Sequence, residues 1–128
     1  MDNMQWQYYL LVFAGGGSGS MLRLLISRQD FLQGKSLFIA TLAANLIACF
    51  ILGLIAHRYT LSPIRDWSWY LFATGFCGGL STFSTFSLEN LELIVSGQWS
   101  MALIYTSISI LGCLLALWAG LLVSPKIL

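Results

Sequence analysis

The chain has 128 residues, of which 58% are hydrophobic and only 9% are charged, and its mean hydropathy is +0.81. A soluble domain carries roughly 25% charged residues, so this composition predicts an all-α integral membrane protein. The net charge of +1 gives no basic surface for nucleic acid, and the three cysteines form no CxxC or Cys/His cluster typical of a metal site.

The first predicted span covers about residues 8–26. The run Gly-Gly-Gly-Ser-Gly-Ser at residues 15–20 repeats small residues four apart. Small residues at this spacing let helix backbones approach closely in lipid, so the run predicts a tight helix contact rather than a phosphate loop. Arg23 lies one turn inside the end of this span. Either its side chain reaches the membrane interface, or it places a cation at the mouth of an anion path.

The second predicted span covers about residues 37–56. Thr41, Asn45, Cys49 and Gly53 are each four residues apart and form one narrow stripe along the helix. An asparagine in mid-membrane is costly unless its amide finds a partner. Two interpretations of Asn45 follow: an interhelical hydrogen bond, or N–H donors offered to a passing anion.

The third predicted segment, residues 67–95, is too long for one straight span. As a continuous helix it would run roughly 43 Å, whereas the hydrocarbon core is about 30 Å thick. Three glycines within residues 75–79 predict a helix break near 75–81 in mid-membrane, with the second half restarting near Ser81 or Thr82. Carbonyls freed by the break could bind a cation. The alternative is that the glycines only permit close packing.

Aromatic and hydroxyl side chains follow the glycines. Phe83 and Phe86 share one helix face. Neighbouring faces carry the hydroxyls of Ser81, Ser84, Thr85 and Ser87. Hydroxyl donors and the positive edges of phenyl rings can replace the water around an anion without fixed charge, and weak, multiple contacts suit rapid passage. The alternative for the two phenylalanines is ordinary packing.

The fourth predicted span covers about residues 101–123, where Tyr105, Ser109 and Cys113 share a face. The two carboxylates before it, Glu89 and Glu92, are interpreted as solvated groups at or beyond the membrane interface.

Four spans place both termini on one side of the membrane. The lysines and arginines are then nearly balanced between the two sides, three against two or three. They are Arg58, Arg65 and Lys126 on one side, and Arg28 and Lys35, with Arg23 nearby, on the other. Because this bias normally sets orientation, its near absence predicts insertion in both directions and pairing of two opposed copies.

Three stretches of the chain resemble the Fluc (CrcB) family of fluoride channels. They are residues 15–20 followed by Arg23, Thr41-Leu42-Ala43-Ala44-Asn45-Leu46, and GFCGGLSTFSTFSLE at residues 75–89. The resemblance covers nearly the whole chain, and the third stretch is long and specific. It implies an antiparallel, dual-topology homodimer of four-helix subunits with two fluoride pores. Such a protein would sit in lipid in the cell (inner) membrane and relieve fluoride toxicity by passive, selective efflux.

The same resemblance implies roles for individual pore residues. Asn45 corresponds to a pore-lining asparagine, and Phe83 and Phe86 correspond to paired rings whose edges face fluoride. Tyr105 and Ser109 fall where the family has polar pore residues.

Further roles implied by the resemblance concern the helix break and the pore ends. The backbone carbonyls of Gly78 and Ser81 would hold a structural sodium ion at the dimer interface. Arg23 corresponds to an arginine near the vestibule and Glu89 to the carboxylate at the end of the hydroxyl track. Ser81 stands where many members have threonine, and Cys113 where serine is common.

Other functional classes agree less well with the sequence. A small, dual-topology, proton-coupled exporter of organic cations needs a carboxylate buried in the membrane, and spans 1, 2 and 4 contain none. A purely structural subunit explains the glycines, but not Asn45 together with the phenylalanine and hydroxyl run. No nucleophile–base pair suggests an enzyme.

Overall fold

The computed structural model describes residues 3–28, 37–61 and 66–124. The regular secondary structure in this part of the chain is all helical, and it contains no strand. Its elements, in chain order, are α1 (Asn3–Ser27), α2 (Leu37–Leu61), the π-helix η1 (Trp69–Cys77), α3 (Gly78–Leu80), α4 (Phe83–Val95) and α5 (Trp99–Val123).

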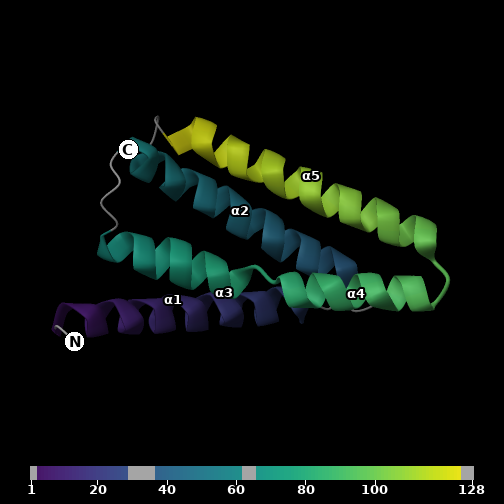
Figure 1. Cartoon of the computed structure of the whole chain (residues 1–128), viewed down its shortest axis with the longest axis horizontal. Helices are drawn as coiled ribbons and strands as arrows, with labels where there is room; N and C mark the ends of the chain where they lie inside the picture. The colour runs from purple at the N-terminus through teal and green to yellow at the C-terminus, as the bar shows by residue number, and fades with distance from the viewer. Residues whose placement is uncertain (1–2, 29–36, 62–65, 125–128) are drawn as a thin grey trace.

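Three of the described helices are long and apolar enough to cross a membrane: Trp6–Ser27 in α1, Phe38–Ala56 in α2, and α5 over its whole length. The start of α1 and the end of α5 lie at the same end of the bundle (Figure 1). Many large apolar side chains of these helices are exposed on the single chain, as expected for surfaces that face lipid or another protein.

Helix α2 is the centre of the arrangement because it contacts every other described helix. Its most extensive contact is with α5, which runs beside it (Figure 1). Gly53 of α2 packs against Gly120 of α5, and a Cβ at either position would collide with a backbone carbonyl of the other helix. The Ser124 hydroxyl, at the end of α5, also donates a hydrogen bond to the Leu54 carbonyl of α2 at 2.7 Å. Alanines 44 and 48 face the other way, into a small core with Cys77 and Leu80.

Helix α1 packs along η1 and α3 through glycines, as the small-residue run predicted. Gly15 lies against Gly75, and a Cβ at Gly15 would collide with the Leu71 carbonyl oxygen. A Cβ at Gly19 would likewise collide with the Phe76 carbonyl. The predicted tight contact at residues 15–20 is therefore confirmed.

The glycines after residue 74 stay helical, contrary to the expectation that they unwind the chain. Gly75 lies within η1, and Gly78 has helical angles (φ −64°, ψ −36°). The extended residues come later: Ser81 (φ −76°, ψ 151°) and Thr82 (φ −149°, ψ 116°) separate α3 from α4. Gly75 and Gly79 instead provide the space that α1 needs, because a Cβ at Gly79 would collide with the Gly16 carbonyl.

A tight turn reverses the chain between α4 and α5. Gly97 has a positive φ of 79°, a conformation that side chains other than glycine rarely adopt. The Gly97 and Gln98 amides donate to the carbonyls of Ile94 and Leu93, at 3.0 and 2.8 Å. This helix cap brings the start of α5 alongside α4.

Candidate functional site

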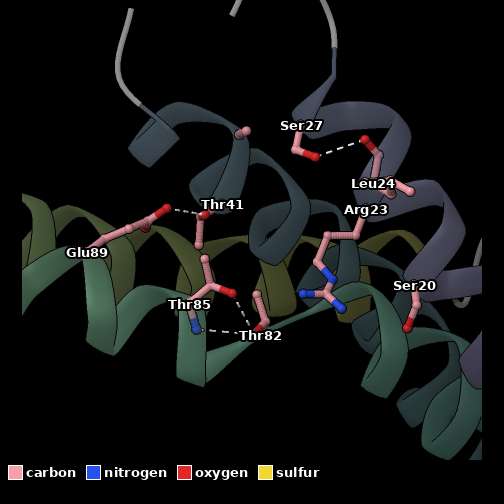
Figure 2. A pocket seen from close by; sticks show the side chains of 9 residues that line it. Ser20, Arg23, Leu24, Ser27, Thr41, Thr82, Thr85 and Glu89 are labelled. Atoms are coloured by element: carbon pink, nitrogen blue, oxygen red, sulfur yellow. Dashed lines mark hydrogen bonds between the residues drawn. The ribbon is translucent and has the colours of Figure 1, made fainter. Parts of the chain in front are cut away.

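Two hollows meet at the extended segment between α3 and α4. The first, called here the phenylalanine groove, has a volume of about 240 Å³ and is lined by Asn45, Cys49, Ser81, Thr82, Phe83, Phe86, Ser109, Ile110 and Cys113. The second, the arginine pocket, has a volume of about 480 Å³ and is lined by Ser20, Arg23, Leu24, Ser27, Ala40, Thr41, Thr82, Thr85 and Glu89 (Figure 2). Thr82 lines both hollows, so the extended segment lies where they approach each other.

Asn45 is bound to the extended segment. Its Oδ1 atom accepts a 2.9 Å hydrogen bond from the backbone N–H of Thr82. In a continuous α-helix this N–H would donate to the Gly78 carbonyl instead. Of the two interpretations of Asn45, the structure bears out a hydrogen bond to a neighbouring segment, and the donor role toward an anion stays a prediction. Because Oδ1 is the bonded atom, the Nδ2 donors of the same amide remain available on a side chain that lines the groove.

Thr82 is also the residue that caps the start of α4. Its Oγ1 atom accepts from the Thr85 N–H at 3.4 Å, which satisfies one of the free amides at the helix start. The hydroxyl oxygens of Ser84 and Thr85 lie 3.1 and 3.2 Å from Thr82 Oγ1. Three hydroxyls are thus gathered at the first turn of α4. Ser84 and Thr85 were predicted as donors, and the predicted restart of the helix near Ser81 or Thr82 is confirmed, because Thr82 caps α4.

Phe83 and Phe86 are neighbours on α4, with ring centroids 5.6 Å apart and planes tilted by 39°. Phe86 packs against the Tyr105 ring, with a centroid distance of 5.3 Å. Phe83 is 80% exposed on the single chain, so packing within the described residues does not explain its presence. Both rings line the same groove as the Asn45 amide.

Ser109 contributes a buried hydroxyl to this groove. The side chain is only 6% exposed, and within residues 3–28, 37–61 and 66–124 its Oγ atom lies beside the Tyr105 hydroxyl without completing a well-aligned hydrogen bond. A hydroxyl whose hydrogen bonds are incomplete can still donate to an ion or molecule in the groove.

Glu89 is buried, and the interpretation of it as a solvated end is wrong. It is 4% exposed, and its two carboxylate oxygens accept hydrogen bonds of 2.6 Å each from the hydroxyls of Thr41 and Tyr105 (Figure 2 shows the first). Donors from α2 and α5 thus replace water around the carboxylate. The sequence places both donors on the polar faces of their helices. Thr41 is four residues before Asn45, and Tyr105 is four residues before Ser109. The hydroxyl of Tyr105, expected to face the pore, is bound to Glu89.

Arg23 and Glu89 lie on opposite sides of the arginine pocket, with Thr41, Thr82 and Thr85 between them (Figure 2). The Arg23 Nε atom is buried and forms no hydrogen bond with the described part of the chain. The side chain lines the arginine pocket together with three threonines, which favours the interpretation of a cation beside a polar path over simple extension to the membrane interface.

The two positions expected to supply carbonyls to a cation lie near each other in sequence but differ in surroundings. Gly78 is exposed, with open space where a Cβ would stand. Ser81 lines the phenylalanine groove, and its hydroxyl donates to the Cys77 carbonyl at 2.9 Å. Within the described residues no group of three or more His, Cys, Asp or Glu side chains could hold a metal, so any ion here would depend on backbone oxygens.

Comparisons with known proteins agree with this geometry. The model of the family described as "CrcB-like protein, Camphor Resistance (CrcB)" matches residues 10–121. A protein of Pseudomonas putida F1 named "Fluoride-specific ion channel FluC" is 43% identical over 112 residues, which cover 86% of this chain and 90% of the relative. A protein of the same name from Escherichia coli O139:H28 is 42% identical over 107 residues, which cover 83% and 84% of the two chains. The chain is a multi-pass membrane protein and belongs to the CrcB family.

Proposed function

We propose that this protein is a fluoride-selective ion channel that lets fluoride leave the cell passively and so relieves fluoride toxicity. The observation that carries the proposal is the buried Ser109 hydroxyl in the phenylalanine groove. It shares the groove with the Asn45 amide and the rings of Phe83 and Phe86, and none of these groups is charged. Relatives that cover most of this chain bear the name of fluoride-specific channels.

Uncharged donors explain both selectivity and speed. Fluoride is small and strongly hydrated, so an amide, a hydroxyl and ring edges at close range can replace its water. A fixed charge in the groove would hold the ion too tightly for rapid passage. Arg23, on the far side of Thr82, would raise the local concentration of anions at the mouth of the path. Ser84 and Thr85 extend the line of hydroxyl donors between the two hollows.

The proposed assembly is an antiparallel homodimer of dual-topology subunits. Phe83, at 80% exposure, leaves the groove open on one side of the single chain, and a second copy would close it. Three of the cations in the charge count, Lys35, Arg65 and Lys126, lie outside the described residues. A test is a topology assay with a reporter on the C-terminus: dual topology requires the reporter on both sides of the membrane, and a single orientation would refute it.

The extended segment would lie in mid-membrane and hold a structural sodium ion at the dimer interface. Both proposed ligands, the carbonyls of Gly78 and Ser81, have lost their α-helical partners. The Thr82 N–H donates to Asn45, and the Thr85 N–H donates to Thr82 Oγ1. Carbonyl oxygens without N–H partners suit a hard monovalent cation.

A proton-coupled exporter of organic cations is the second candidate, and one observation favours it. Glu89 is a carboxylate buried between helices, which such an exporter needs and which the sequence did not indicate. However, both oxygens of Glu89 already accept 2.6 Å hydrogen bonds, so binding a cation there would require breaking them.

Ion efflux from liposomes that hold the purified protein separates the two candidates. A channel releases fluoride rapidly, with negligible release of chloride, and needs no proton gradient. An exporter takes up a lipophilic cation such as tetraphenylphosphonium only when a proton gradient is imposed. Empty liposomes, and liposomes with protein denatured before reconstitution, are the controls. Equal release of fluoride and chloride would refute the proposed selectivity.

A further inference from the structure

An amide and a hydroxyl join α4 to α5 outside both hollows. The Thr106 hydroxyl donates to the Asn90 Oδ1 atom at 2.8 Å, and the Asn90 Nδ2 atom donates to the Phe86 carbonyl at 2.9 Å. Because a carbonyl only accepts, the nitrogen of the amide must face Phe86, which leaves Oδ1 for Thr106. Both side chains are half-buried, and neither lines the phenylalanine groove or the arginine pocket. The pair is therefore placed to act through other residues rather than on an ion in either hollow.

Helix α4 has few neighbours that could hold it in place. Among the described helices it contacts only α2 and α5, and the extended residues Ser81 and Thr82 separate it from α3. Near its end, α4 packs on α5 through Leu93 and Ala102. Near its start, Phe83 is 80% exposed, so packing within the described residues holds this ring only weakly. The position of the Phe83 ring therefore depends on how α4 is rotated about its own axis.

Two hydrogen bonds from α5 reach adjacent residues of α4. Glu89 accepts from the Tyr105 hydroxyl at 2.6 Å, and Asn90 accepts from the Thr106 hydroxyl at 2.8 Å. Adjacent residues of an α-helix point about 100° apart, so the two bonds hold α4 from different directions. One bond alone would let the helix turn about it. A rotation of about 10° would move a side-chain atom that lies about 5–6 Å from the helix axis by about 1 Å.

We propose that Asn90 and Thr106 are positioning residues for the anion path. Their link sets the rotation of α4 and so places the rings of Phe83 and Phe86 in the phenylalanine groove. The Nδ2 bond ties the same amide to the backbone of Phe86, whose ring packs on the Tyr105 ring at a centroid distance of 5.3 Å. Groups that act on a small ion must be held to within about 0.5 Å, less than the displacement that a small rotation would cause. The effect on fluoride rests on the proposed function, whereas the effect on ring position does not.

The role of the Thr106 hydroxyl is tested by two substitutions of similar shape. Thr106→Val removes the hydroxyl, and Thr106→Ser keeps it. We expect fluoride release from liposomes to slow by about tenfold in Thr106→Val and to keep the wild-type rate in Thr106→Ser. The matched control is Ser107→Ala, which removes a hydroxyl from the next, exposed residue of α5 and should keep the wild-type rate. A wild-type rate in Thr106→Val, or equal slowing in the serine variant or the control, would overturn the inference.

A double-mutant cycle tests whether the two residues act as one link. Asn90→Leu breaks the link from the side of α4. The double variant Asn90→Leu/Thr106→Val should release fluoride no more slowly than the slower of the two single variants, because each substitution already removes the same link. Losses that multiply in the double variant would show that the residues act independently and would overturn the inference.

The position of the ring can be measured without transport. With 4-fluorophenylalanine in place of Phe86, the fluorine NMR resonance in detergent reports the surroundings of the ring. It should shift or split in Thr106→Val and match the wild type in Thr106→Ser, and Asn90→Leu gives the same comparison if Thr106→Val does not assemble. A resonance that neither Thr106→Val nor Asn90→Leu changes would overturn the inference, whatever these variants do to stability. If the wild type releases no fluoride, the proposed function fails, while the resonance still decides whether the pair positions the ring.

Discussion

The side-chain oxygen of Asn45 occupies the position that the Gly78 carbonyl would hold in an unbroken helix, because it accepts the Thr82 N–H at 2.9 Å. One bond between α2 and the extended segment therefore has two effects. It frees a backbone carbonyl of α3, and it turns the amide so that its N–H donors remain for the groove. If the freed carbonyl holds the proposed cation and the amide donors meet the anion, this one side chain links assembly to permeation, and substitutions of Asn45 can separate the two roles.

Asn45→Asp keeps an acceptor for Thr82 but removes the amide donors and adds a negative charge. We expect it to fold and to lose fluoride efflux, since the carboxylate repels the anion. Asn45→Ala removes the acceptor and leaves the Thr82 N–H unpaired, which costs about 1–3 kcal/mol of stability. Thermal unfolding in detergent and efflux from liposomes, measured on both variants, provide the comparison. If Asn45→Asp conducts at the wild-type rate, the donor role is incorrect.

Replacing a phenyl ring with an aliphatic side chain tests the role of the ring edges. Phe83→Ile and Phe86→Ile keep apolar bulk but remove the positive edge. We expect efflux to fall by at least about tenfold, the size of a loss of roughly 1.4 kcal/mol, while the elution volume of the assembly is unchanged. Because Phe83 is 80% exposed, its substitution should barely change the stability of one subunit. Phe83→Tyr, which keeps the aromatic edge, is the control. Wild-type efflux in both isoleucine variants would rule out a role for the rings.

Sodium dependence tests the proposed cation at the carbonyls of Gly78 and Ser81. An ion that binds only the folded assembly raises its stability by mass action, by about 2.7 kcal/mol at a concentration 100 times its dissociation constant. We expect the unfolding temperature to rise with sodium concentration at constant ionic strength, with N-methylglucamine as the replacement cation. An unfolding temperature that stays constant as sodium replaces N-methylglucamine would argue against the site.

The bond between Tyr105 and Glu89 can be tested by a double-mutant cycle. Tyr105→Phe leaves one oxygen of a buried carboxylate without its 2.6 Å donor, which should cost about 1–3 kcal/mol. In a Glu89→Gln background the same change should cost less, with a coupling of about 0.5–3 kcal/mol. The free energy of unfolding in denaturant gives all four values. Phe38→Leu, next to the Tyr105 ring but not bound to Glu89, is the control for packing. Additive costs would mean that the bond contributes little.

Much of the site was predictable because its signals are local. The four-residue spacing of Asn45 with Thr41 and of Ser109 with Tyr105 identified the polar faces of two helices, and the glycine run identified the close contact of α1. The state of Glu89 was not predictable in this way. Its burial depends on hydroxyls from α2 and α5, which only the packing of three helices brings together.

The sequence correctly predicted that the third segment restarts near Ser81 or Thr82, but it placed the unwound residues among the glycines, which stay helical. Glycine permits both an unwound chain and close helix packing, and only the position of α1 decides between them. With α1 against Gly75 and Gly79, these glycines stay helical. Two hydrogen bonds then favour an extended chain at Ser81 and Thr82. The Asn45 Oδ1 atom accepts from the Thr82 N–H, and the Thr82 hydroxyl accepts from the Thr85 N–H at the start of α4. Helix α2, far away in sequence, thus fixes where the third segment becomes extended.

Glycine substitutions in α1 test this account of the packing. Gly19→Ala should destabilise the protein by about 1–3 kcal/mol, because its Cβ would collide with the Phe76 carbonyl, a backbone atom that cannot rotate away. Gly17→Ala, two residues earlier in the same helix, is the matched control, since open space surrounds that position. There alanine should be neutral or stabilise by about 0.5–1 kcal/mol through its helix preference. The free energies of unfolding of the two variants in mixed micelles provide the measurement. Equal effects at the two positions would mean that helix preference, and not the close contact with α3 and η1, sets the response of α1.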